Sequence, residues 1–283
     1  MTSWSTVKIP RVDDVKEIGG RSKSQLAAMS PAEFRGMVRR GEWTDLTVFA
    51  CDGYVITNLA IVPKEYAFEF LLFCNRNPRP CPVLDVTEPG DPHPKLLAPE
   101  ADVRTDLPKY RVYQDGKLID EPTDITKYWR DDLVAFFIGC SLMIDFALRG
   151  ANVNYRMVGA FISKIPCIPA GRFHSDRMAV SCRVFKSSHD AVRAVQISSR
   201  LRAAHGYPVH IGDWASIGIR DFNEPEIAPR GELPPEPGEV AMFWGEGNTP
   251  QLAAMESKTP FLISHFPGYM FVGDQRIEEL ANL

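Results

Sequence analysis

The stretch Leu133-Val-Ala-Phe-Phe-Ile138, followed by Gly139-Cys140-Ser141, decides the fold. Its apolar run fits a buried strand, and the small residues behind it fit a turn that opens a helix. The same pattern recurs at 239–248, again before a helix, and at 260–268. Strands that alternate with helices are typical of α/β proteins, so these segments predict an α/β fold.

The composition describes an ordinary globular chain. Of the 283 residues, 45% are apolar and 24% are charged, and the net charge is −4. These values exclude a disordered, collagen-like or coiled-coil protein, and they predict no general attraction to nucleic acid. The longest apolar stretch, 133–144, is too short to cross a bilayer. We therefore expect neither a nucleic-acid nor a membrane partner.

Cysteine usage and the N-terminal segment indicate the compartment. None of the six cysteines forms a Cys-x-x-Cys pair. Residues 1–14 contain no apolar signal-peptide core. The sequence thus predicts a cytoplasmic protein with reduced thiols.

Local patterns predict several further elements. A helix is expected at 31–40, capped by Ser30 and Glu33, and a second helix from Pro63 to Cys74, which is apolar nearly all round and therefore deeply packed. A hairpin is expected around Asp115-Gly116, and a third helix at 190–204.

The turns that follow the three strands predict the site. In open α/β sheets, ligands bind beyond the carboxyl ends of the strands. Helix N-termini there, at Ser141 and Thr249, offer free N–H groups to an anion. The pattern indicates a carboxylate-binding pocket, although most such corners in α/β proteins bind nothing.

The chain resembles the bacterial "putative hydro-lyase" family, also called D-glutamate cyclase-like. The matching motifs run in order along nearly the whole sequence. They include Asn77-Pro-Arg-Pro-Cys-Pro82, Arg104-Thr-Asp-Leu-Pro-Lys-Tyr-Arg-Val-Tyr113, Trp129 to Ser141, Pro208-Val-His-Ile-Gly-Asp213 and Thr249-Pro-Gln251.

The resemblance implies a three-layer α/β sandwich with a smaller two-layer α+β part. We expect residues 130–224 to form the smaller part, inserted between 1–129 and 225–283 of the larger one. The resemblance also implies a hydro-lyase or a cyclase that acts on a small carboxylate.

This sequence departs from the family pattern at several polar positions. Asp145 stands where the family has glutamate, Glu246 where it has cysteine, and Tyr269 where it has histidine. These are changes of chemistry as well as of size. We expect the fold to carry over more readily than the substrate.

Three residues are candidates for catalysis. Glu246 follows a strand between two glycines and could take a proton next to a carboxylate; otherwise it is an exposed loop residue. His265 could act as an acid or base, or be a capping or core histidine. Cys140 could be a nucleophile at a helix start, or a small core residue.

Seven residues are candidates for binding the substrate. Arg104 could instead pair with Asp106, and Asn58 could bond the backbone. His205, His210 and Asp213 lack metal-site spacing, and no nucleotide-binding glycine motif occurs, so no metal or organic cofactor is predicted. The candidates are Ser141, Thr249, Gln251, Arg104, Asn58, His210 and Asp213.

The sequence therefore favours a lyase-type enzyme, a hydro-lyase or cyclase, for a small carboxylate such as an amino acid or hydroxy acid derivative. Two alternatives stay open. One is a non-catalytic protein that binds the same ligand, and the other is a thiol-dependent amide hydrolase or transferase that uses Cys140. Assembly into a homodimer or a higher homo-oligomer also stays open.

Overall fold

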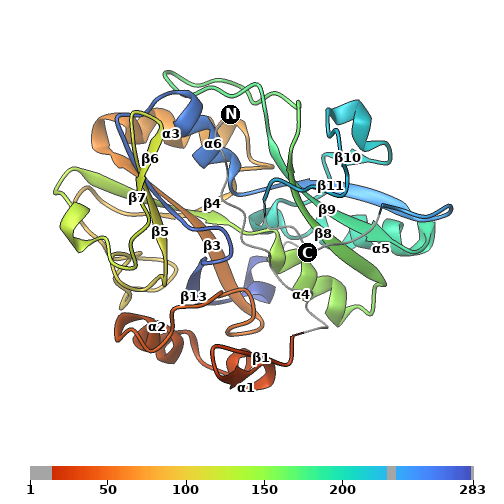
Figure 1. Cartoon of the computed structure of the whole chain (residues 1–283), viewed down its shortest axis with the longest axis horizontal. Helices are drawn as coiled ribbons and strands as arrows, with labels where there is room; N and C mark the ends of the chain where they lie inside the picture. The colour runs from red at the N-terminus through yellow and green to blue at the C-terminus, as the bar shows by residue number, and fades with distance from the viewer. Residues whose placement is uncertain (1–14, 228–233, 282–283) are drawn as a thin grey trace.

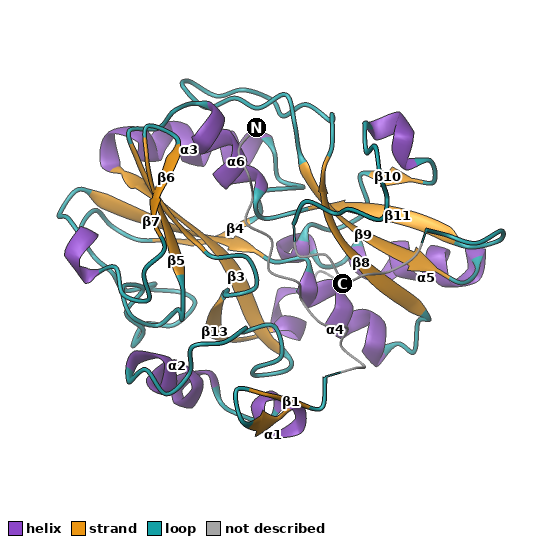
Figure 2. Cartoon of the chain, viewed as in Figure 1, coloured by secondary structure: helices purple, strands orange, loops and turns teal. Residues whose placement is uncertain are grey.

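The computed structural model describes residues 15–227 and 234–281 (Figure 1). Two β-sheets lie side by side, a seven-stranded sheet on the left of Figure 1 and a four-stranded sheet on the right. Helices and long loops cover both sheets (Figure 2). A two-stranded ribbon of β1 (Glu17–Ile18) and β2 (Arg21–Ser22) lies outside them.

The larger sheet has the strand order β4-β7-β3-β12-β5-β6, and β13 also pairs with β3. Its strands are β3 (Tyr54–Pro63), β4 (Val83–Val86), β5 (Tyr110–Gln114), β6 (Lys117–Asp120), β7 (Leu133–Gly139), β12 (Phe261–His265) and β13 (Phe271–Arg276).

The smaller sheet has the order β10-β11-β9-β8. Its strands are β8 (Tyr155–Ile162), β9 (Ala179–Phe185), β10 (His210–Ile211) and β11 (Val240–Gly245). The α-helices are α1 (Lys23–Ala27), α2 (Pro31–Arg39), α3 (Lys64–Arg76), α4 (Leu142–Gly150), α5 (Ser188–Ser198) and α6 (Thr249–Glu256). Short 3₁₀ helices are η1 (Thr126–Tyr128), η2 (Arg202–Ala204), η3 (Trp214–Ile217) and η4 (Ile277–Leu280).

The predicted three-layer α/β sandwich is wrong. Every strand pairing in the described residues is antiparallel, so the fold is a mixed α+β architecture built on two antiparallel sheets. The strand–helix units are present, but their helices do not return the chain to a parallel neighbour. Instead, α4 carries the chain from β7 to β8, and α6 carries it from β11 to β12, each time into the other sheet.

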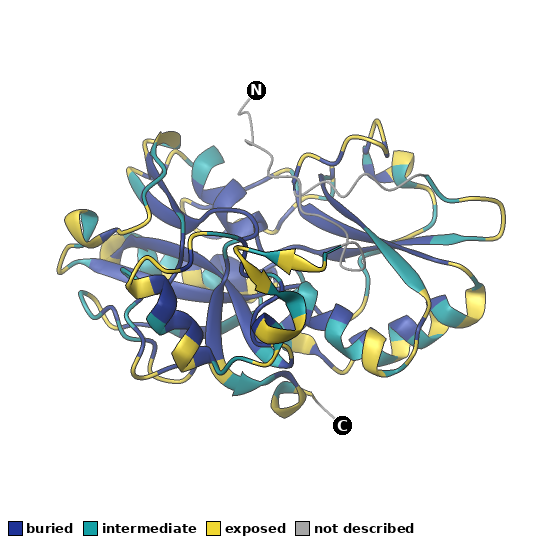
Figure 3. Cartoon of the chain, turned by 60° about the horizontal axis from the view of Figure 1, so that its bottom comes forward, coloured by how far each residue is buried: buried dark blue, intermediate teal, exposed yellow. Residues whose placement is uncertain are grey.

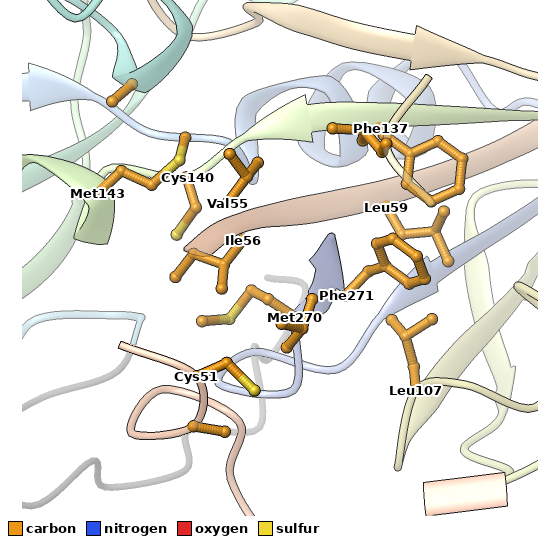
Figure 4. Close-up of a cluster of buried hydrophobic side chains, with 14 of the residues drawn as sticks. Cys51, Val55, Ile56, Leu59, Leu107, Phe137, Cys140, Met143, Met270 and Phe271 are labelled. Atoms are coloured by element: carbon orange, nitrogen blue, oxygen red, sulfur yellow. The ribbon is translucent and has the colours of Figure 1, made fainter. Parts of the chain in front are cut away.

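Burial on both faces explains the apolar runs that favoured an α/β fold. Along β3, Leu59 and Ile61 face one hydrophobic core, whereas Ala60 and Val62 face the other. Helix α3 contacts β3 and β7. Figure 4 shows part of the first core, in which Leu59 and Phe137 pack near Phe271. A strand buried on both faces lacks polar alternation whatever the direction of its neighbours.

Strand β3 brings two of the three strand ends together. It pairs antiparallel with β7 on one side and with β12 on the other, so β7 and β12 run in the same direction. Their carboxyl ends therefore lie at the same edge, on either side of residues 57–59. Two of the turns that are predicted to line a ligand pocket therefore lie at one edge of an antiparallel sheet.

Several local predictions are confirmed. Helix α2 has the Ser30–Glu33 capping box, and the hairpin turn has positive φ at Asp115 and Gly116. Ser187 caps α5, which ends earlier than expected. The deep packing predicted for the second helix is wrong, because Phe68 of α3 is 74% exposed. Figure 3 shows the helices turning their exposed residues outward while most of the two sheets is buried.

The predicted division of the chain into 1–129 with 225–283, and 130–224, stays a prediction. The two sheets interleave along the chain, since β7 joins the larger sheet and β11 the smaller one. None of the described helices is long and apolar enough to span a bilayer.

Gly139, the last residue of β7, lies where the two halves of the fold touch. A Cβ atom on Gly139 would collide with the carbonyl oxygen of Ala203, in η2. By contrast, nothing lies within 4 Å of a Cβ added to Gly150, at the end of α4. Glycine at position 139 is thus required by close backbone approach.

We expect Gly139→Ala to lower the free energy of unfolding by about 3 kcal/mol, because the added methyl group overpacks the junction. Gly150→Ala is the matched control and should be neutral or stabilising by up to about 1 kcal/mol. Urea unfolding followed by tryptophan fluorescence measures both. Equal stability of the two variants would contradict this account of the junction.

Candidate functional site

The three strand–turn segments meet at the junction of the sheets. The Nδ2 group of Asn58, on β3, donates a hydrogen bond to the carbonyl oxygen of Gly139 at 3.0 Å. Gly247, in the turn after β11, lies against the same two groups, and a Cβ there would collide with the Asn58 amide. The turns after β7 and β11 and the middle of β3 are therefore in direct contact.

A cavity of about 40 Å³ lies at this junction. It has room for one or two water molecules or for the end of a small ligand. Among its lining residues are five of the candidates from the sequence and two further polar residues. They are Asn58, Cys140, Ser141, Glu246 and His265, together with Ser181 and Asn248.

Glu246 is the acidic group of the cavity and is only 7% exposed. Its Oε2 accepts hydrogen bonds from the backbone N–H of Asn248 at 2.7 Å and from the Asn248 Nδ2 at 2.6 Å. Burial raises the pKa of the Glu246 carboxyl, while the hydrogen bonds and the charge of Arg183 oppose that rise. A carboxyl with a raised pKa is a stronger base once it is ionised.

His265 ends β12 and is almost fully buried. Its Nδ1 lies 3.1 Å from the backbone nitrogen of Leu59, which donates to it, and 3.5 Å from the Leu59 oxygen. The shorter contact assigns Nδ1 as an acceptor and places the proton on Nε2. Burial lowers the pKa of His265 to about 4, so the ring is neutral at pH 7.

Cys140 and Ser141 form the turn that opens α4. Burial, together with the nearby Glu246 charge, raises the pKa of the Cys140 thiol to about 12. The helix N-terminus does not offset this, so the thiol stays protonated at neutral pH and is a poor nucleophile. The Ser141 side chain makes no capping hydrogen bond, although Ser141 is the N-cap of α4.

A buried ion pair stabilises this turn. Arg183, on β9, has no exposed surface, and its Nε and Nη2 donate to the two Asp145 oxygens at 2.9 and 2.5 Å. The same Nη2 donates to the Ser141 carbonyl oxygen at 2.8 Å. The pair thereby ties the start of α4, where Ser141 lines the cavity, to the smaller sheet.

A larger groove of about 740 Å³ adjoins the cavity. The groove and the cavity share Val48, Leu142 and Met157 in their walls. Its polar groups include Asn154 and the Arg149–Asp52 ion pair, which is 2.9 Å long. Any ligand too large for the cavity has space to extend here.

The structure places five other candidates outside the cavity. Thr249 donates to the Glu246 carbonyl oxygen at 2.8 Å, and Gln251 donates to the Tyr113 hydroxyl at 2.6 Å. Arg104 pairs with Asp102 at 2.6 Å instead of with Asp106.

The last two lie at the outer edge of the smaller sheet. His210, on β10, bonds the Asp213 carbonyl oxygen at 2.7 Å, and the Asp213 side chain caps η3. The described residues contain no group of three or more His, Cys, Asp or Glu side chains placed to hold a metal ion.

Three polar residues at the site, Asn248, Ser181 and Arg183, were not among the candidates. Asn248 was visible in the sequence as part of the turn that holds Glu246, so proximity in sequence could have found it. Arg183 sits inside an apolar strand, and an arginine in such a strand is itself a signal, because it requires a buried partner.

We expect Asp145→Leu to lower the free energy of unfolding by about 3–5 kcal/mol, because it leaves the Arg183 charge buried and unpaired. The double variant Asp145→Leu/Arg183→Met should recover most of that loss, since no charge remains. Urea unfolding measures both variants. A double variant as unstable as the single one would show that the pair does not act as a unit.

Two buried histidines should make the protein sensitive to acid. Burial lowers the pKa of both His205 and His265 to about 4 from 6.5. Between these pH values the unfolded chain binds protons that the folded chain does not, so stability falls as the pH is lowered. The loss is up to about 3 kcal/mol per histidine.

His205→Asn isolates one of these contributions. His205 has a left-handed backbone with φ of 73°, which asparagine tolerates. Unfolding curves at pH 7, 5.5 and 4.5 should show a smaller loss of stability in the variant than in the wild type. Parallel pH profiles would contradict the assignment.

Comparison with known proteins places the chain in a family. The D-glutamate cyclase family model matches residues 134–274. "Putative hydro-lyase BLi00500/BL02808" of Bacillus licheniformis is 48% identical over 90% of this chain and 98% of its own length. "Putative hydro-lyase YcsI" of Bacillus subtilis is 46% identical over 90% of this chain and all of its own length.

A solved structure, a nitrogen repressor-like protein from Methanococcus jannaschii, aligns with 88% of this chain and 99% of its own. Its TM-score of 0.39 and its sequence identity of 11% are too low to support any argument about the site. By contrast, the family model and the two relatives, which are 46% and 48% identical over 90% of this chain, support the same family assignment. The chain belongs to the D-glutamate cyclase family.

Proposed function

We propose that this protein is a lyase-type enzyme, a hydro-lyase or cyclase, that removes a proton next to the carboxylate of a small substrate. The observation that carries the proposal is the buried Glu246 carboxyl, with its raised pKa, in a cavity where three strand ends meet. The names of the relatives point to the same class of reaction.

The proton transfer needs a base that is held in place and shielded from water. Glu246 accepts the proton from carbon. In a dehydration, the bond from the neighbouring carbon to its hydroxyl then breaks, and the departing hydroxyl takes the proton back from Glu246 and leaves as water. In a cyclisation, Glu246 takes a proton from the substrate's amino group as its nitrogen attacks a carboxyl carbon, and returns it to the hydroxyl whose bond to that carbon breaks, so that water leaves. One buried carboxyl therefore serves both reactions.

The negative charge that develops on the substrate needs hydrogen-bond donors. The Nε2–H of neutral His265 is one donor, because Nδ1 is already occupied by Leu59. The first turn of α4, whose N-cap is Ser141, adds the positive end of the helix dipole. The reacting end of the substrate would lie in the cavity, and the rest would extend into the groove.

We expect Glu246→Gln to abolish turnover while leaving the fold intact. The test is a proton NMR time course in D₂O with amino acids, hydroxy acids and 5-oxoproline, which reports both products and loss of α- or β-proton signals. Glu65→Gln is the control, because Glu65 is exposed on α3, away from the cavity. Because the base must be ionised, the exchange rate should fall with decreasing pH, with a midpoint above 4.5.

Exchange that is unchanged in Glu246→Gln would disprove the role of Glu246. A folded wild-type protein that binds these acids without any exchange would instead support a non-catalytic binding protein. The Cys140→Ser variant should retain turnover, because the thiol takes no part in the proposed chemistry.

A further inference from the structure

Asn248 is the only residue whose side chain bonds the Glu246 carboxylate among the described contacts of that carboxyl. It is the N-cap of α6, but its side chain makes no capping bond to the helix. Instead, its backbone N–H and its Nδ2 group both donate to one oxygen, Oε2. Two donors of one residue thus converge on one carboxylate oxygen, and the backbone N–H of Gly247 also bonds the carboxyl.

The other half of the Asn248 amide has no partner. The side chain is only 3% exposed and lines the cavity, and its Oδ1 atom is buried without a hydrogen bond. The orientation of the amide is fixed, because turning it over would place Oδ1 against the carboxylate oxygen. A buried acceptor without a partner costs about 1–3 kcal/mol, so a ligand with an N–H or O–H group would relieve this cost on binding.

We propose that Asn248 positions Glu246 through its two donors and uses its free Oδ1 to recognise a hydrogen-bond donor on the ligand. This inference rests on the proposed function of Glu246 and adds a requirement to it. The substrate carries a hydroxyl or amino group within reach of the same oxygen of Asn248. A carboxylic acid that lacks such a group leaves Oδ1 buried and unpaired, and it should bind more weakly.

The positioning role can be tested without a known substrate. Infrared difference spectra between the wild type and Glu246→Gln identify the Glu246 carboxyl band, and a pH titration of that band gives its midpoint. In Asn248→Leu, the midpoint should rise by about one pH unit, because the ionised form loses a charge-assisted hydrogen bond. Asn248→Ala serves as a second variant should the leucine variant fail to fold.

Asn75→Ala is the control for this titration. Asn75 is exposed on α3 and does not line the cavity. Its substitution should leave the Glu246 midpoint where it is. Midpoints that are unchanged in both Asn248 variants would overturn the positioning role.

The recognition role is tested with ligands that differ only by the donor group. Ligand-observed NMR compares lactate with propionate, and alanine with propionate. The wild type should bind one donor-bearing member at least about tenfold more tightly than propionate, and Asn248→Leu should lose most of that preference. Equal binding of the members, binding of none of them, or an unchanged preference in the variant would overturn the recognition role.

These outcomes are separable from the fate of the proposed function. If Glu246→Gln retains full exchange activity, the catalytic role of Glu246 fails, whereas the infrared titration still decides whether Asn248 holds it. If Glu246→Gln is inactive and the Asn248 variants titrate and discriminate like the wild type, only the inference about Asn248 fails. Which of lactate and alanine is preferred identifies the donor as a hydroxyl or an amino group.

Discussion

The contact between the Asn58 amide, the Gly139 carbonyl and Gly247 is the constraint on which the rest of the structure depends. At this point the end of β7, the middle of β3 and the turn after β11 approach one another so closely that no side chain fits between them. The larger and smaller sheets therefore approach each other most closely here, and apolar side chains of both sheets pack together in the two hydrophobic cores around this point. The cavity exists because the polar ends of the strands are gathered around this one contact.

The electrostatics of the site follow from the same geometry. Two carboxylates are buried close to the turn that opens α4, and they have different hydrogen-bond and charge partners. Asp145 receives a guanidinium, so its charge is neutralised within the protein. The Glu246 carboxylate accepts hydrogen bonds only from N–H donors, and the charge of Arg183 acts on it from farther away. Glu246 therefore forms no ion pair and can gain or lose a proton. One carboxylate is structural, and the other is available for chemistry.

Much of this arrangement could be predicted from local sequence. The three apolar runs with small-residue turns are strands that end at the junction, and Glu246, His265, Cys140, Ser141 and Asn58 all line one cavity. Strand direction could not be predicted, because burial on both faces produces the same apolar run in parallel and antiparallel sheets. The partner of Gln251 was equally hidden, since Tyr113 meets it only in the folded chain, whereas Thr249 and Arg104 bond Glu246 and Asp102, which lie two or three residues away in sequence.

The route of the chain between the sheets has a consequence for how the protein reaches its native state. Because α4 leads out of the larger sheet and α6 leads back into it, β12 and β13 can pair with β3 only after the chain has traversed the smaller sheet. Contacts this distant in sequence slow folding, since long loops must close before their pairing contributes stability. During synthesis, β3 leaves the ribosome well before β12. The edge of β3 that pairs with β12 therefore stays unpaired until the last quarter of the chain has been synthesised.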